Sequence, residues 1–339
     1  MIDEPIAIIG MSCRYPQAEG IDALWQLLLE GRDVIGPYPG GRFRDVDAAY
    51  EQTAAASKIL ATHLGGFIPE VDRFDASFFG ISPREAAFID PQQRLLLEVG
   101  WNALEDAGQV REDYDRSRTG VFIGLWTTDY ENHIFRQPKD PEFYLLTGCG
   151  RSTACGRLSF AFGFEGPSVT VDTACSSSMV AIHLACQSLR RDECGMALAG
   201  GANVILSTGF TRLFTNAGML SRDGRCKFGD QRADGFVRSE GAGVVVLKRL
   251  SDAVAAGDGI YAVICGSSIN NDGRSGGLLV TPSREGQCQM LLDAWGRAGL
   301  ATRFGTVAGA NHFTAIAPLA DPASPMVSRL RELAGDRAG

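Results

Sequence analysis

VDTACSSSMVAIHLAC, residues Val171 to Cys186, contains a strand that runs directly into a helix. The segment Ser168 to Asp172 alternates in the way a buried strand does. From Ser176 onward, apolar residues recur at helical spacing. These residues are Met179, Ile182, Cys186 and Leu189. The pattern places Cys175 in the turn between the strand and the amino end of the helix.

The position of Cys175 predicts a reactive thiol. Unpaired backbone N–H groups and the helix dipole at the amino end of a helix favour a thiolate over a thiol. A thiolate is a strong nucleophile at neutral pH, so we predict that Cys175 is the catalytic nucleophile. The alternative for any free cysteine is a buried and inert side chain. We assign that structural role to the other eight cysteines of the chain.

The composition is that of an ordinary globular protein. The 339 residues are 45% hydrophobic and 21% charged, and the net charge is −8. A negative chain is a poor partner for nucleic acid or for an anionic membrane surface. The nine cysteines form no CxxC pair, which favours free thiols in a reducing compartment. The acidic amino terminus does not resemble a secretory signal, and no apolar run reaches membrane-spanning length, so we expect a cytoplasmic protein.

Strands and helices alternate along the chain, which predicts an α/β fold with an at least partly parallel sheet. One helix has clear start and stop signals: Asp90 as the N-cap, Pro91 in the first turn and Gly108 at the end. A helix is also expected over residues 21–31, with Leu24, Leu27 and Leu28 facing inward. Residues 32–75 are rich in Gly, Pro and charge and predict a long surface excursion. Further strands are expected at 6–10, 120–124, 168–172, 196–198, 244–247 and 260–266, and a further helix at 284–299.

Five stretches together resemble the ketosynthase domain of modular type I polyketide synthases, a member of the thiolase-fold β-ketoacyl synthases. They occur in the family's order between residue 4 and about residue 300, and as a set they are very specific. The stretches are EPIAIIGMSCRYP, FDASFFGISPREAAFIDPQQRLLLEVGWNALEDAG, GPSVTVDTACSSS, ADGFVRSEGAGVVVLKRLSDA and GSSINNDGRSGGLLVTPSREGQ. The family's nucleophile lies in the motif D-T-A-C-S-S, which matches Asp172 to Ser177 and carries that role onto Cys175.

The resemblance implies a reaction and its partners. The cysteine accepts an acyl group from the phosphopantetheine thioester of an acyl carrier protein. A malonyl-type extender then loses carbon dioxide and attacks the acyl-enzyme, which is a decarboxylative Claisen condensation. The family is typically a homodimer, and GPSVTVDTAC matches the region where its subunits pair. No metal or organic cofactor is implied for this chain, because the phosphopantetheine arm belongs to the carrier.

The resemblance also divides the chain. Residues 1–250 match the N-terminal half of the thiolase-like fold, and residues 251–300 match the start of its second half. The family pattern stops near Leu300, and residues 301–339 form an unmatched tail. The family's histidine motifs H-G-T-G-T and N-x-G-H do not occur in the sequence. A smaller departure is Gly229, where the family usually has Phe.

Two hypotheses follow from these departures. The first is an acyltransferase of the β-ketoacyl synthase type, in which Cys175 is acylated but full condensation suffers from the missing histidines. The second is an inactive, truncated ketosynthase remnant that acts at most as a carrier-binding or dimerisation module. Transacylation needs mainly a thiolate, so we expect acylation without condensation product.

None of the four histidines is an evident substitute for the family's pair. His183 lies eight residues after Cys175, about 12 Å along the helix axis, and a packing role is expected for it. His63 and His133 are expected in surface loops. His312 lies in a tail that is faintly similar to the end of an α/β-hydrolase. The G-x-S-x-G elbow that such a triad needs occurs only at residues 273–277, within a loop that the ketosynthase resemblance already explains.

Overall fold

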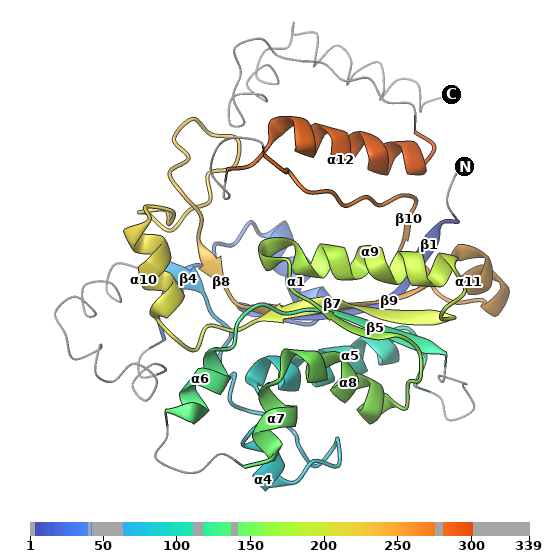
Figure 1. The fold of residues 1–339 in the computed structure, drawn as a ribbon, viewed down its shortest axis with the longest axis horizontal. Helices are drawn as coiled ribbons and strands as arrows, with labels where there is room; N and C mark the ends of the chain where they lie inside the picture. The colour runs from blue at the N-terminus through green and yellow to red at the C-terminus, as the bar shows by residue number, and fades with distance from the viewer. Residues whose placement is uncertain are drawn as a thin grey trace, which may run out of the picture.

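A computed structural model describes residues 4–39, 42, 64–110, 118–136, 142–274 and 281–300. Within these residues a mixed sheet runs through the centre, and helices lie against both of its faces (Figure 1). The strand order is β10-β1-β9-β7-β5-β6, with the short β2 paired to β1. These strands are β1 (Ile6–Tyr15), β2 (Ala18–Glu19), β5 (Thr119–Gly124), β6 (Ser168–Val171), β7 (Met196–Asn203), β9 (Gly241–Arg249) and β10 (Ala262–Ile264).

The three strands β5, β6 and β7 run parallel to one another, and the other neighbouring pairs are antiparallel. Parallel neighbours need a crossover connection, and the helices between them supply it. The carboxyl ends of β5, β6 and β7 therefore meet at one edge of the sheet. The helices are α1 (Ile21–Leu29), α4 (Pro83–Ala86), α5 (Pro91–Asp106), α6 (Asp129–Phe135), α7 (Tyr144–Cys149), α8 (Arg151–Phe162), α9 (Ser177–Arg190), α10 (Gly209–Asn216), α11 (Leu250–Ala256) and α12 (Arg284–Arg297).

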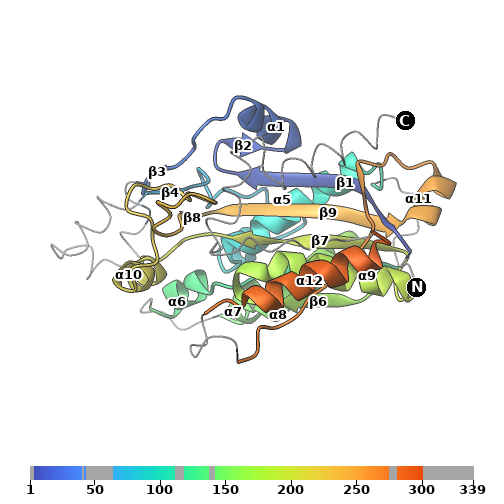
Figure 2. The ribbon, with the colours of Figure 1, turned by 90° about the horizontal axis from the view of Figure 1, so that it is seen from above.

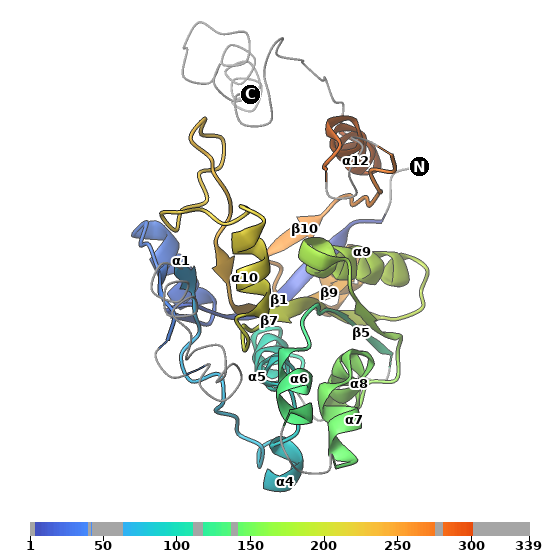
Figure 3. The ribbon, with the colours of Figure 1, turned by 60° about the vertical axis from the view of Figure 1, so that its left-hand side comes forward.

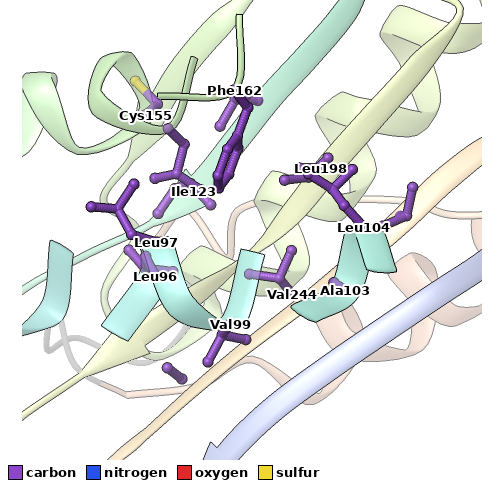
Figure 4. Packing of buried hydrophobic residues seen from close by; sticks show 14 of the residues in the cluster. Leu96, Leu97, Val99, Ala103, Leu104, Ile123, Cys155, Phe162, Leu198 and Val244 are labelled. Atoms are coloured by element: carbon purple, nitrogen blue, oxygen red, sulfur yellow. The ribbon is translucent and has the colours of Figure 1, made fainter. Parts of the chain in front are cut away.

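The middle strands of the central sheet are buried on both faces, whereas the terminal strands β6 and β10 are partly exposed; the expectation that Ser168 to Asp172 form a buried strand was therefore wrong. Helices α5 and α8 cover one face and α9 covers the other (Figures 1 and 3). Side chains of one strand alternate between the two layers: Val121 and Ile123 pack with α5 and α8, whereas Phe122 packs with α9. Figure 4 shows part of the larger core, in which Leu97 and Leu104 of α5 lie among sheet residues. The position of α9 is thus fixed by a separate cluster of apolar side chains, between this helix and the sheet.

Helix α5 confirms the start and stop signals of the sequence. The Asp90 carboxylate accepts a hydrogen bond from the backbone N–H of Gln92 at 2.8 Å, and Pro91 occupies the first helical position. Gly108 has φ +66°, the left-handed conformation that ends a helix. The helix packs so closely on β1 that a Cβ at Gly10 would lie 2.6 Å from the Ala103 carbonyl oxygen. Only glycine permits this approach.

The remaining described elements lie around the central sheet. A small sheet, in the order β3-β4-β8, is formed by β3 (Gly36–Pro37), β4 (Leu64–Gly66) and β8 (Arg238–Ser239). Figure 2 shows β1, β9 and β7 side by side from above. Helix α12 lies on the α9 side of the sheet in Figures 1 and 3. Among the described residues, no helix is both long and apolar enough to cross a membrane.

Some local predictions were wrong. The first strand is ten residues long, because β1 pairs with β9 as far as Arg14. Leu28 was predicted to face inward, yet it is 60% exposed, and Leu27 is the buried residue of α1. A short helix at the rim of a sheet buries a narrower stripe than its composition suggests. The predictions for residues 301–339, including His312, and for His63 fall outside the described residues.

Candidate active site

The turn around Cys175 lies where β6 ends. Residues Ala174–Ser176 form one turn of 3-10 helix, and α9 begins directly after it at Ser177. Cys175 is exposed in this turn, two positions before the helix. The positive end of the α9 dipole therefore lies beside the residue, as the sequence predicted.

Two glycines bring the start of α9 onto the sheet. A Cβ at Gly124, the last residue of β5, would lie 2.6 Å from the Ser177 carbonyl carbon and from the Ser178 nitrogen. A Cβ at Gly201 of β7 would lie 3.1 Å from the Ser178 Cβ. The helix start is thus seated against backbone, and larger side chains on these strands would displace it.

The serines of the motif hold the turn together. The Thr173 N–H donates to the Ser177 hydroxyl at 2.9 Å, and that hydroxyl donates to the Ala174 carbonyl at 2.7 Å. The Ser176 hydroxyl donates to the Thr173 carbonyl at 2.8 Å. Ala174 has φ +54°, a left-handed conformation that a residue with a Cβ adopts only at a cost. This hydrogen-bond set overcomes the cost and fixes the residue next to Cys175.

An ion pair between Asp172 and Arg151 also stabilises this turn. One Asp172 oxygen accepts a hydrogen bond from the Ala174 N–H at 3.1 Å, and the other forms an ion pair with Arg151. Arg151 also donates to the Trp126 carbonyl at 3.1 Å. Arg151 is the first residue of α8, and Trp126 follows β5. Sequence reasoning missed this contact, because nothing local connects Arg151 with a residue 21 positions away.

The other thiols of the chain differ from Cys175 in their surroundings. All nine cysteines are free, as predicted, and five of them are buried. Burial raises the pKa of Cys149 to about 12 and that of Cys186 to about 11, which disfavours their thiolates. The expectation that the other eight are buried was wrong for Cys226 and Cys265, which are exposed, and for Cys288, which is half-buried. Cys226 and Cys265 do not stand at the amino end of a helix, and Cys288 is the fifth residue of α12. Exposure and position together single out Cys175.

The two described histidines lie on helices. His183 is buried on α9, as predicted, and its Nδ1 lies 2.9 Å from the Ser267 hydroxyl. The prediction that His133 lies in a surface loop was wrong: His133 is half-buried on α6. The segment DYENHIF is rich in charged and polar residues, which is typical of a surface loop, yet it forms a short helix. This helix packs against Arg94 through Tyr130.

A cavity of about 770 Å³ lies near α5 and α6, with Arg94, Tyr130 and His133 in its wall. Its lining also includes Phe67 and residues 68–72, but no residue of the turn at Cys175. The Cys175 sulfur and the cavity are therefore separate features. Among the described residues, no cluster of three or more His, Cys, Asp or Glu side chains could hold a metal ion.

A second feature that sequence reasoning missed is a set of buried carboxylates, Asp90, Asp129 and Glu240, near the loop that follows β7. Burial raises the pKa of Asp90 to about 6, and the nearby Asp129 carboxylate acts in the same direction. Asp129 accepts a hydrogen bond from the Leu206 N–H at 3.1 Å, which joins α6 to the loop after β7. The side chain of Glu240 is completely buried; it pairs with Arg42 at 2.6 Å and accepts the Ile205 N–H at 2.9 Å. These groups fix the loops at the carboxyl edge of the sheet.

The N-terminal domain model of the β-ketoacyl synthases matches residues 3–253. The chain belongs to this family. One phenolphthiocerol/phthiocerol polyketide synthase subunit of Mycobacterium tuberculosis is 47% identical over 294 residues, which are 86% of this chain and 19% of the relative. Another subunit of that synthase is 50% identical over 294 residues, 86% of this chain and 16% of the relative. The chain thus spans about a fifth of the length of these curated relatives.

Solved ketosynthases have the same fold. The oxazolomycin ketosynthase domain of Streptomyces albus superimposes with a TM-score of 0.79 and 37% identity, over 88% of this chain and 51% of that one. The ketosynthase from module 6 of the bacillaene synthase of Bacillus subtilis gives 0.74 and 37%, over 87% and 48%. These comparisons confirm the resemblance and the thiolase-like α/β fold that the five sequence stretches predicted. The ketosynthase-family chain covers about half of each solved domain.

Proposed function

We propose that this chain is the acyl-accepting part of a polyketide ketosynthase and that Cys175 is its nucleophile. The observation that carries the proposal is the exposed sulfur at the amino end of α9, in a turn held rigid within a ketosynthase fold. The five buried cysteines lie outside such a turn. A rigid and accessible thiol is what acyl transfer from a bulky carrier protein requires.

The acyl transfer is an exchange of one thioester for another. The Cys175 sulfur attacks the carbonyl carbon of an acyl group on the phosphopantetheine arm of an acyl carrier protein. A new bond forms between the Cys175 sulfur and the acyl carbon, and the bond to the phosphopantetheine sulfur breaks. The phosphopantetheine sulfur leaves as a thiol after taking up a proton. In the condensation that follows in this family, a malonyl-type extender releases carbon dioxide and its carbanion displaces Cys175.

We also propose a homodimer that pairs along the β6 edge. Strand β6 is the terminal strand of the described sheet, and its Ser168 and Val169 are exposed. Phe160 of α8 is 90% exposed and Met179 of α9 is 67% exposed, so large apolar side chains flank the strand. An exposed edge strand flanked by apolar side chains is suited to pairing with a second copy.

We further propose that the protein works in the cytoplasm, because its nine free thiols fit a reducing compartment.

Intact-protein mass spectrometry after incubation with an acyl-carrier thioester tests the function. We expect one acyl adduct on the wild-type chain and none on Cys175→Ser. Cys226→Ser is the matched control, because Cys226 is also exposed, and it should be acylated at the wild-type rate. A wild-type chain that takes up no acyl group, or an adduct that persists in Cys175→Ser, would refute the proposal.

Condensation is measured separately, by adding malonyl-carrier protein and following carbon dioxide and the β-ketoacyl product. The family's two histidine motifs do not occur in this sequence. We therefore expect the acyl-enzyme to accumulate without product. Product at the rate of a full ketosynthase would show that other groups supply the proton transfer and charge stabilisation.

A further inference from the structure

We propose that Arg151 is a positioning residue for Cys175 and acts through Asp172. The inference deepens the proposed function, because it concerns the same sulfur. Its basis is a continuous set of contacts that joins the first residue of α8 to the turn at Cys175. Arg151 itself forms no part of the D-T-A-C-S-S motif.

The first contact fixes Arg151 to the scaffold. Gly150, the residue before it, accepts a hydrogen bond from the Gln93 side chain of α5 at 3.1 Å. Gly150 also accepts one from the Thr153 hydroxyl at 2.6 Å, which closes the first turn of α8. A Cβ at Gly150 would lie 2.8 Å from the Leu146 carbonyl oxygen, so the chain turns tightly between α7 and α8. The backbone at Gly150, directly before Arg151, is therefore held by two hydrogen bonds in a tight turn.

The second contact links two loops. A single guanidinium nitrogen, Nη1, donates both to the Trp126 carbonyl and to Asp172 Oδ2. Trp126 is itself packed against Phe210 of α10, with ring centroids 4.5 Å apart. The loop after β5 and the loop after β6 are thus joined through one nitrogen atom.

The third contact reaches the turn. Asp172 Oδ1 accepts the Ala174 N–H, and Ala174 is the residue with φ +54° that precedes Cys175. Arg151 orients the carboxylate, and the carboxylate holds the strained residue beside the nucleophile. The Arg151 charge also offsets the negative charge of Asp172, which would otherwise oppose an anionic sulfur in the same turn.

The contribution of such a pair to the rate is moderate. The side chains of Arg151 and Asp172 are 44% and 38% exposed, so solvent screens their attraction. Loss of Arg151 should slow acylation of Cys175 about threefold to tenfold. Arg151→Lys should restore most of the rate, because one ammonium nitrogen can make both hydrogen bonds that Nη1 makes.

The test compares alkylation by neutral iodoacetamide and by anionic iodoacetate, followed at Cys175 by peptide mass spectrometry. Arg151→Ala leaves the Asp172 charge without its partner, so the iodoacetate rate should fall about threefold or more relative to the iodoacetamide rate. A purely structural loss would slow both reagents equally. Arg151→Lys should return the ratio to the wild-type value. In an Asp172→Asn background the contact from Arg151 to the turn is already weakened, so Arg151→Ala should not slow the neutral iodoacetamide any further.

Arg118→Ala is the matched control. Arg118 forms an exposed ion pair with Asp192 and lies just before β5, at the opposite end of that strand from Gly124. Its removal should leave both alkylation rates within about twofold of wild type. An unchanged reagent ratio in Arg151→Ala, or a lysine variant that behaves like the alanine variant, would overturn the proposal. Alkylation needs no acyl donor, so this result is independent of whether the wild-type chain accepts an acyl group.

Discussion

Gly124→Ala should displace Cys175, the proposed nucleophile, without contacting it. An ideal Cβ at Gly124 lies 2.6 Å from backbone atoms of Ser177 and Ser178, whereas ordinary contacts begin near 3.4 Å. The start of α9 must then move by about 0.4 Å to relieve the overlap, and by about 0.8 Å to restore an ordinary contact, because the strand beneath it is packed on both faces. Ser177 bonds to Thr173 and Ala174, so the turn that carries Cys175 moves with the helix.

The expected losses follow from this shift. Overpacking of this kind costs about 1–3 kcal/mol of the free energy of unfolding. A displacement near 1 Å at a reacting atom costs up to about 100-fold in rate, so acylation should fall roughly 10- to 100-fold. Urea denaturation and intact-mass acylation kinetics measure the two effects.

Gly195→Ala is the control for the glycine substitution itself. Gly195 precedes β7 at the other end of the sheet, and a Cβ there meets no atom within 4 Å. Its urea midpoint and acylation rate should match the wild type. If Gly124→Ala acylates at the wild-type rate while its stability falls, the seating of α9 on β5 does not position Cys175.

Two further predictions concern the buried carboxylates at the loop edge. Because burial raises the folded-state pKa of Asp90 to about 6, its contribution to stability is fully present below about pH 4 and is lost as the pH rises through 6. The Asp90 contribution to the free energy of unfolding should therefore fall by roughly 2–3 kcal/mol over this range. Asp90→Asn still caps α5 but lacks this contribution, so the free energy of unfolding of the wild type, measured in urea relative to this variant, should fall by that amount as the pH rises. Glu240→Ala leaves Arg42 partly buried without its partner and should cost about 3–5 kcal/mol, whereas Glu70→Ala, in an exposed pair, should cost less than about 1 kcal/mol. A difference between wild type and Asp90→Asn that does not change with pH, or equal urea midpoints for Glu240→Ala and Glu70→Ala, would contradict these predictions.

The sequence predicted the elements whose signals are local. Helix α5 has its cap, proline and terminal glycine within the segment itself, and all three are in place. The turn at Cys175 was predicted from a change of period within one short stretch, Val171 to Cys186. A resemblance carried by five separate stretches then indicated the fold, because the stretches supply different strands and helices of the same layered structure.

Features that depend on distant contacts could not be predicted. Leu28 continues the apolar pattern of α1, but no element covers that side of the helix among the described residues. The partnership of Arg151 with Asp172 depends on α8 beginning beside the end of β6, a consequence of the parallel β5–β6 pair. The raised pKa of Asp90 depends on the burial that follows when α5 packs on the sheet.

The departure at Gly229 is consistent with the fold. Gly229 has φ +72°, a conformation in which glycine costs little and phenylalanine would be strained. Phe228, immediately before it, is 84% exposed, so the aromatic side chain of this segment points away from the described core. The segment is instead held by polar contacts, in which Lys227 pairs with Asp223 at 2.8 Å and also with Asp234.

The small residues around Cys175 explain both why its sulfur is exposed and why its turn is held in place. A nucleophile that receives an acyl group from another protein must be accessible, yet an exposed loop ordinarily moves. Here the start of α9 packs directly against the glycines of β5 and β7. The serine hydroxyls of the turn donate hydrogen bonds to its own backbone carbonyls. Neither constraint covers the sulfur. The small residues around the cysteine are therefore as necessary to the site as the thiol, since any larger side chain would either push the helix off the sheet or close the approach.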